Sequence, residues 1–129
     1  MTSSEFTSSD GWLFFALIPA LEKEAFDLRG VIAAADGMNH AIPMVDELNG
    51  AMNRFVAAGL LSGTGGLPRP TDAARALLAG TYTWTGSIHE LFRPLADELN
   101  RRFSLEPVND RVYFDDAAVK VAYEEYRRS

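Results

Sequence analysis

The chain has 129 residues, of which 47% are hydrophobic and 23% are charged, and this balance predicts one globular domain rather than a disordered chain. The absence of cysteine excludes disulfide bonds, thiolate catalysis and cysteine-ligated zinc, and it is compatible with the cytoplasmic location that we expect. A formal net charge of −6 repels phosphate and favours basic partners.

The first predicted element is an apolar helix that follows a polar N-terminal stretch. Ser9 or Asp10 is expected to cap this helix, and Pro19 to bend it or end it early. The apolar run from Trp12 to Leu21 is shorter than the roughly 20 residues that a membrane-spanning helix needs. A secretory signal typically has Lys or Arg before its apolar run, and neither residue precedes this one. We therefore expect a core helix and no contact with a membrane.

Two amphipathic helices joined by a tight corner are expected next. Asp27 is predicted to cap the first, over about Leu28–Asp36. The second is predicted over about Pro43–Ala58, because proline suits the first helical position, and Gly59 is a suitable left-handed stop. The two helices should cross and bury one apolar stripe each. The residues predicted to be in mutual contact are Leu28, Ile32, Leu48, Met52 and Phe55.

A short hairpin and further helices complete the prediction. Segments 60–64 and 67–71 can pair around two glycines, with prolines that keep the second strand short. One helix should run from Thr71 or Asp72 to Gly80. Another should open at a capping box of Ser87 and Glu90, with a kink or a new start at Pro94, and a last one should follow Asp115 or Asp116. We expect a single, mainly α domain over residues 1–129, with a core of about 10–80 and a helical C-terminal extension of about 86–127.

The segment 28–61, the glycine-rich turn at 63–66 and the helix TDAARALL together resemble a winged helix-turn-helix domain. The phrase RFVAAGLL has many counterparts at the end of the recognition helix in that superfamily, and TDAARALL looks like the helix after the wing. The resemblance implies that helix 43–58 is the recognition helix. In the DNA-binding families, the exposed half of this helix enters the major groove between flanking Arg and Lys side chains.

The outward positions of that helix carry few basic residues. Asp46 and Glu47 would face phosphates, Arg54 is the only base on the helix, and the wing offers only Arg69. Because affinity for DNA grows with the number of phosphates neutralised, this surface suits a protein partner better than DNA. The candidate partner surface comprises Asp46, Glu47, Asn49, Asn53, Arg54 and Arg69.

No constellation in the sequence predicts a catalytic, metal or cofactor site. Asp36 and His40 could form half a metal site at their one-turn spacing, but hydrogen bonding to the corner backbone explains His40 better. Adjacent carboxylates such as Asp115 and Asp116 point about 100° apart on a helix, so they do not converge on one substrate. We therefore expect no cofactor and no catalytic residue.

The C-terminal part holds more aromatic residues than are needed to cover a small wing. These are Tyr82, Trp84, Tyr113, Phe114, Tyr123 and Tyr126. They either pack across the back of the core or form an interface, since aromatic side chains are enriched at interface centres. We expect a closed homodimer. Its candidate interface comprises Ile88, Phe92, Leu95, Tyr123 and Tyr126.

Three functions follow from these observations. The leading one is a non-catalytic regulatory or protein-interaction module built on a winged-helix fold. The alternative is a DNA-binding transcriptional regulator that acts as a dimer, and the third is a small enzyme with a site that the sequence does not reveal. Fold alone does not choose among them.

Overall fold

The computed structural model describes residues 4–63, 66–83, 85–105 and 107–128, and it confirms a mainly α fold with a short hairpin. The described helices are α1 (Ser8–Glu22), α2 (Leu28–Asn39), α3 (Val45–Ala57), α4 (Asp72–Ala79), α5 (Phe92–Arg102) and α6 (Asp116–Arg128). The strands are β1 (Leu61–Ser62) and β2 (Arg69–Pro70), and the 3-10 helices are η1 (Gly80–Thr83) and η2 (Ile88–Leu91). Within these ranges, each helix is too short or too polar to cross a lipid bilayer.

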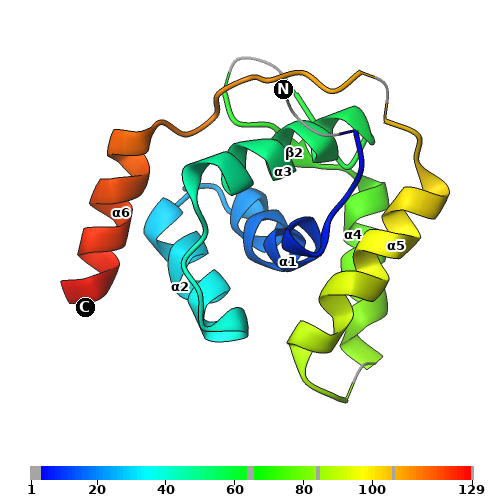
Figure 1. Ribbon diagram of the computed structural model, residues 1–129, viewed down its shortest axis with the longest axis horizontal. Helices are drawn as coiled ribbons and strands as arrows, with labels where there is room; N and C mark the ends of the chain where they lie inside the picture. The colour runs from blue at the N-terminus through cyan, green and yellow to red at the C-terminus, as the bar shows by residue number, and fades with distance from the viewer. Residues whose placement is uncertain (1–3, 64–65, 84, 106, 129) are drawn as a thin grey trace.

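Helix α1 lies in the middle of the molecule, with α2, α3 and α5 around it (Figure 1). The four consecutive residues 12–15 are all buried, so this part of the helix has no solvent face and the predicted core helix is confirmed. The helix begins differently from the prediction, because Thr7 is its N-cap. Asp10 is the third helical residue and completes a capping box with Thr7. Pro19 does not end α1 early, since the helix continues to Glu22.

Gly11 allows α1 to lie directly against the start of α5. A Cβ atom at this position would come within 2.7 Å of the Phe92 carbonyl carbon and would collide with its oxygen. Next to this crossing, the rings of Phe15 and Phe92 lie 6.2 Å apart. The close approach of the two backbones therefore requires glycine at residue 11.

Helices α2 and α3 both pack on α1, and α2 also packs on α6, rather than on each other, unlike the predicted crossing. On α3 the predicted stripe is confirmed as buried, and Phe55 meets Phe14 edge to face with ring centroids 5.8 Å apart. Helix α3 begins at Val45, so Pro43 lies outside it. The reason is that the Glu47 side chain accepts the Met44 N–H at 2.9 Å and places the cap there.

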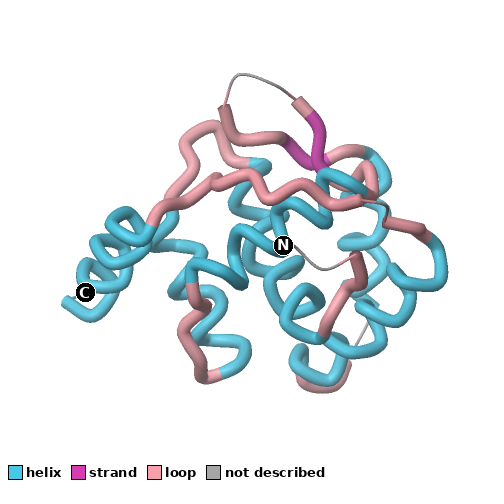
Figure 2. Tube along the Cα trace, turned by 45° about the horizontal axis from the view of Figure 1, so that its top comes forward, coloured by secondary structure: helices cyan, strands magenta, loops and turns pink. Residues whose placement is uncertain are grey.

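The predicted hairpin is present, but each strand has two residues and is shorter than the predicted segments 60–64 and 67–71. Gly59 ends α3 with a φ of 76°, and Leu61 then pairs antiparallel with Pro70. Part of the predicted glycine turn, residues 64 and 65, lies outside the described residues. Figure 2 shows the pair of strands at one end of an otherwise helical molecule.

The predicted helix starts in the C-terminal half are confirmed where local signals set them. Asp115 accepts the Ala118 N–H at 2.7 Å at the start of α6, and Ser87 and Glu90 form the expected capping box. That box opens η2, and α5 then starts with Pro94 in its first turn, where the missing N–H is harmless.

Between α5 and α6 an irregular segment crosses over α3 (Figures 1 and 2). We call residues 107–115 of this segment the strap. Residues 112–114 lie within the strap and form no strand. After the strap, α6 packs on α2, and the Phe26 and Phe114 rings stack 5.6 Å apart beside this contact.

We expect Gly11→Ala to lower the free energy of unfolding by about 1–3 kcal/mol or more, because the new methyl group forces α1 and α5 apart. Gly37→Ala is the matched control, since a Cβ there meets open space. This control should change stability by less than about 1 kcal/mol, in the stabilising direction, because alanine is the better helix former. Urea unfolding followed by circular dichroism measures both. Equal effects would contradict the close approach at Gly11.

Candidate functional site

The outward face of α3 is covered by the strap, which two predicted surface residues hold in place. The side-chain oxygen Oδ1 of Asn49 accepts the N–H groups of Tyr113 and Phe114 at 2.8 and 2.9 Å, and its side-chain NH₂ group donates to the Phe114 carbonyl at 2.8 Å. The Asn53 amide donates to the Arg111 carbonyl at 2.8 Å. Asn53 is only 4% exposed, so its prediction as an outward residue is wrong. Its side-chain amide instead forms a hydrogen bond with the backbone of the strap.

Arg54 is also buried, and its prediction as a partner-facing cation is wrong. Its Nε and Nη2 atoms each lie 2.7 Å from a different oxygen of Asp10, and the two side chains are 9% and 1% exposed. Gly50 leaves room for this pair, because a Cβ there would lie 2.9 Å from Nη2. The guanidinium faces inward because the first turn of α1 supplies a buried carboxylate with matching two-pronged geometry.

The remaining predicted surface residues do not gather with these. The Arg69 guanidinium donates to the carbonyls of Lys23 and Glu22 at 3.0 and 2.9 Å, so it binds the C-terminal end of α1. Asp46 is exposed on the first turn of α3, whereas Glu47 is half-buried. Of the six predicted residues, Glu47 alone lines the groove described next.

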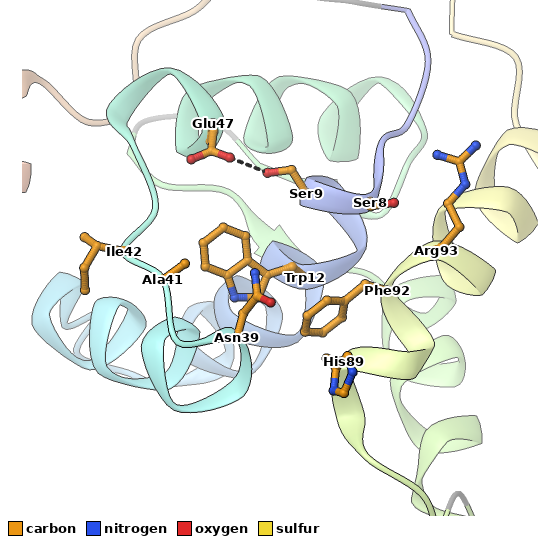
Figure 3. Close-up of a pocket in the computed structure, with 10 residues that line it drawn as sticks. All are labelled: Ser8, Ser9, Trp12, Asn39, Ala41, Ile42, Glu47, His89, Phe92 and Arg93. Carbon is orange, nitrogen blue, oxygen red and sulfur yellow. Dashed lines mark hydrogen bonds between the residues drawn. The ribbon is translucent and has the colours of Figure 1, made fainter.

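A groove of about 500 Å³ opens at the start of α1, where four parts of the fold meet (Figure 3). Its lining consists of Ser8, Ser9 and Trp12 from α1, Asn39, Ala41 and Ile42 from the α2–α3 corner, Glu47 from α3, and His89, Phe92 and Arg93 from η2 and α5. The Trp12 indole N–H donates to the Ala35 carbonyl at 2.9 Å, which fixes the ring beside the groove. Trp12 and Phe92 give it an aromatic floor, and its polar groups lie on the walls.

The groove is lined by one acidic side chain, Glu47, and one basic side chain, Arg93, and these two differ in whether an ion-pair partner neutralises them. On one wall Arg93 is paired with Asp97 at 3.1 Å, on the next turn of α5. On the other wall the Glu47 carboxylate accepts Ser9 Oγ–H at 2.8 Å and the Met44 N–H at 2.9 Å. In the part of the chain that the structure describes, no Lys or Arg forms an ion pair with Glu47. The groove therefore suits a cationic group better than an anionic one.

The groove was not predicted, because its residues come from distant segments. His89, for example, reaches it from η2, where its Nδ1 lies 2.7 Å from Ser87 Oγ. The other histidine, His40, ends α2 in a left-handed conformation, and its backbone N–H donates to the Asp36 carbonyl at 2.7 Å. Within the described ranges, no three His, Asp or Glu side chains lie together as a metal site would require.

Two residues of the predicted dimer interface are core residues instead. Phe92 and Leu95 are 7% and 9% exposed and belong to the main hydrophobic cluster, because α5 uses its apolar stripe to cover α1. Ile88 is half-buried against the same cluster. These three side chains therefore pack within a single chain.

The two tyrosines of α6 are half-buried, and both make contacts within the chain. Tyr126 donates its hydroxyl to Asp36 at 2.6 Å, which fastens α6 to α2, and this hydrogen bond is the main reason why the pKa of Tyr126 is raised. The Arg127 guanidinium lies over the Tyr123 ring, 5.7 Å from its centre. Of the other aromatic residues noted above, Trp84 and the side chain of Tyr82 lie outside the described residues.

No protein-family model matches this chain, and neither a curated protein nor a solved structure matches it. Its function therefore has to be inferred from the geometry.

We expect Arg54→Met to lower the free energy of unfolding by about 3–5 kcal/mol, because it leaves Asp10 as an uncompensated buried charge. The double variant Arg54→Met/Asp10→Asn should recover a large part of this loss, since asparagine can still accept the Thr7 N–H but carries no charge. Urea unfolding of both variants tests the pair. A double variant as unstable as the single one would contradict it.

Proposed function

We propose that this chain is a non-catalytic protein-interaction module that binds a basic segment of a partner protein in the groove at the start of α1. The observation that carries the proposal is Glu47, a half-buried carboxylate on the groove wall that two donors hold in place and that no described cation neutralises. A Lys or Arg side chain seated there would face both this carboxylate and the aromatic residues of the floor. Charge-assisted contact and cation–π attraction would then act together.

The covered face of α3 supports a protein partner over DNA. In this proposal α2, α3 and the β1–β2 hairpin correspond to the helix-turn-helix and the wing, and α3 is the recognition helix. The strap lies across that helix, and both basic residues expected on the DNA side, Arg54 and Arg69, are bound elsewhere in the chain. A duplex would therefore meet the strap, whose Arg111 is exposed, and the carboxylate of Asp46, so this face would neutralise few phosphates.

Selection from a random peptide library against the full chain tests the groove. We expect the selected peptides to share a Lys or Arg next to an apolar residue. Glu47→Gln should weaken a selected, fluorescently labelled peptide about tenfold or more, because a hydrogen bond to a charged group contributes roughly 1.5–3 kcal/mol. Glutamine keeps an acceptor for the Met44 N–H, so the start of α3 is preserved.

Asp46→Asn is the matched control for this measurement. It removes the same charge from the neighbouring residue, but Asp46 is exposed and does not line the groove. The control should change affinity less than about twofold, because exposed charges are screened by salt. Selected peptides without basic residues, or equal effects of the two variants, would overturn the proposal.

For DNA, we expect no sequence-specific duplex binding tighter than about micromolar at physiological salt, since this surface neutralises few phosphates. Selection from a random duplex pool, followed by fluorescence anisotropy, measures it. A nanomolar complex with one sequence and a steep salt dependence would instead support the alternative, a dimeric transcriptional regulator.

A further inference from the structure

The Glu47 carboxylate in the groove is held by the same kind of cap as the buried Asp10. Glu47 is the third helical residue of α3 and accepts the N–H of Met44, the residue before that helix, at 2.9 Å. Asp10 is the third helical residue of α1 and accepts the Thr7 N–H at 2.8 Å in the same way. Because both carboxylates start from the same local hydrogen bond, what Asp10 binds indicates what Glu47 can bind.

At Asp10 this cap leaves room for an arginine side chain. The Arg54 guanidinium donates through Nε to one carboxylate oxygen and through Nη2 to the other, each at 2.7 Å. The oxygen that accepts from Nε is the same one, Oδ2, that accepts the Thr7 N–H. A carboxylate oxygen has two lone pairs, so it can accept a backbone N–H and a guanidinium N–H together. A capping carboxylate of this chain therefore binds a two-pronged guanidinium without losing its cap.

Glu47 has the same capacity, but its remaining acceptor sites belong to the groove. Oε1 accepts the Met44 N–H at 2.9 Å, and Oε2 accepts the Ser9 hydroxyl at 2.8 Å. Each oxygen thus keeps one lone pair that no Lys or Arg of the described residues uses. Figure 3 shows the carboxylate directed from α3 toward Ser9 and the Trp12 ring. A donor that enters the groove would therefore meet one unused acceptor site on each oxygen.

The floor of the groove favours a guanidinium over an ammonium group. Trp12 and Phe92 line it, and a planar guanidinium can pack flat on an aromatic ring and is less strongly hydrated than an ammonium. An ammonium is a compact point charge without this flat face. The basic side chain of the groove, Arg93, is already paired with Asp97 at 3.1 Å, which reduces its repulsion of a second cation.

We propose that the groove selects arginine over lysine, with the guanidinium bound to both oxygens of Glu47 as Arg54 is bound to both oxygens of Asp10. This inference rests on the function proposed above and narrows the basic segment of the partner to one that carries arginine. Because lysine has the same charge, the selection comes from the two-pronged geometry rather than from charge alone.

Two peptides of equal charge test the selection. They are acetyl-Ala-Leu-Arg-Leu-Ala-amide and the same peptide with Lys in place of Arg. Each is titrated into the isotope-labelled full chain at physiological salt, and the NMR shifts of the Ser9 and Met44 backbone amides report binding at Glu47. We expect the arginine peptide to bind at least about fivefold more tightly, because it forms one more charge-assisted hydrogen bond with the carboxylate.

Glu47→Gln tests whether the carboxylate is the source of the selection. Glutamine keeps one side-chain oxygen for the Met44 N–H, but its NH₂ group cannot accept a hydrogen bond from a guanidinium. The two peptides should then bind within about twofold of each other. Asp46→Asn is the matched control, since it removes the same charge outside the groove and should leave the preference for arginine unchanged.

Equal binding of the two peptides to the wild-type chain, or a preference that survives Glu47→Gln, would overturn the selection of arginine. Either result would leave the proposed function intact, as a groove that accepts any basic segment. If neither peptide shifts the two amides, the selection of arginine is also wrong, and the selection from a random peptide library still decides the proposed function. The two proposals therefore fail separately.

Discussion

The buried ion pair of Asp10 and Arg54 fixes how α1 and α3 lie against each other. Removing two charges from water is costly, and the pair is tolerable only because every oxygen finds a donor: two guanidinium nitrogens, and the Thr7 N–H at 2.8 Å. The pair is specific as well as stable, since both nitrogens must reach both oxygens at once. Ser9 is next to Asp10 and donates its hydroxyl to Glu47 on the groove wall. The geometry of the groove therefore follows from the same ion pair.

Asparagine amides supply the hydrogen bonds that strands would provide in another fold. Asn100 exchanges two bonds with the Phe6 backbone, at 2.7 and 2.8 Å, and Asn49 does the same for Phe114. Both segments are irregular, and their buried backbone groups need partners that neighbouring strands do not give. The consequence at Phe6 is a buried ring stacked on Phe55. The consequence at Phe114 is that the strap covers α3.

Local signals in the sequence were sufficient for several helix boundaries, but not for the starts of α1 and α3 and not for the use of polar side chains. Asp27, Gly59 and Asp115 act where the sequence places them, because capping depends on neighbours within a few residues. Arg54 and Asn53 were misplaced because periodicity shows which residues are polar, not whether a distant carboxylate or carbonyl will receive them. The groove was missed for the same reason, since four separate segments form it and, of the residues that line it, only Glu47 belongs to the candidate partner surface.

Helix α2 links the C-terminal helix α6 to the groove. Tyr126 fastens α6 to Asp36, and one turn later Asn39 and the corner at Ala41 form a wall of the groove. The position of this wall therefore depends on how α6 packs on α2, as well as on the ion pair of Asp10 and Arg54 that joins α1 to α3.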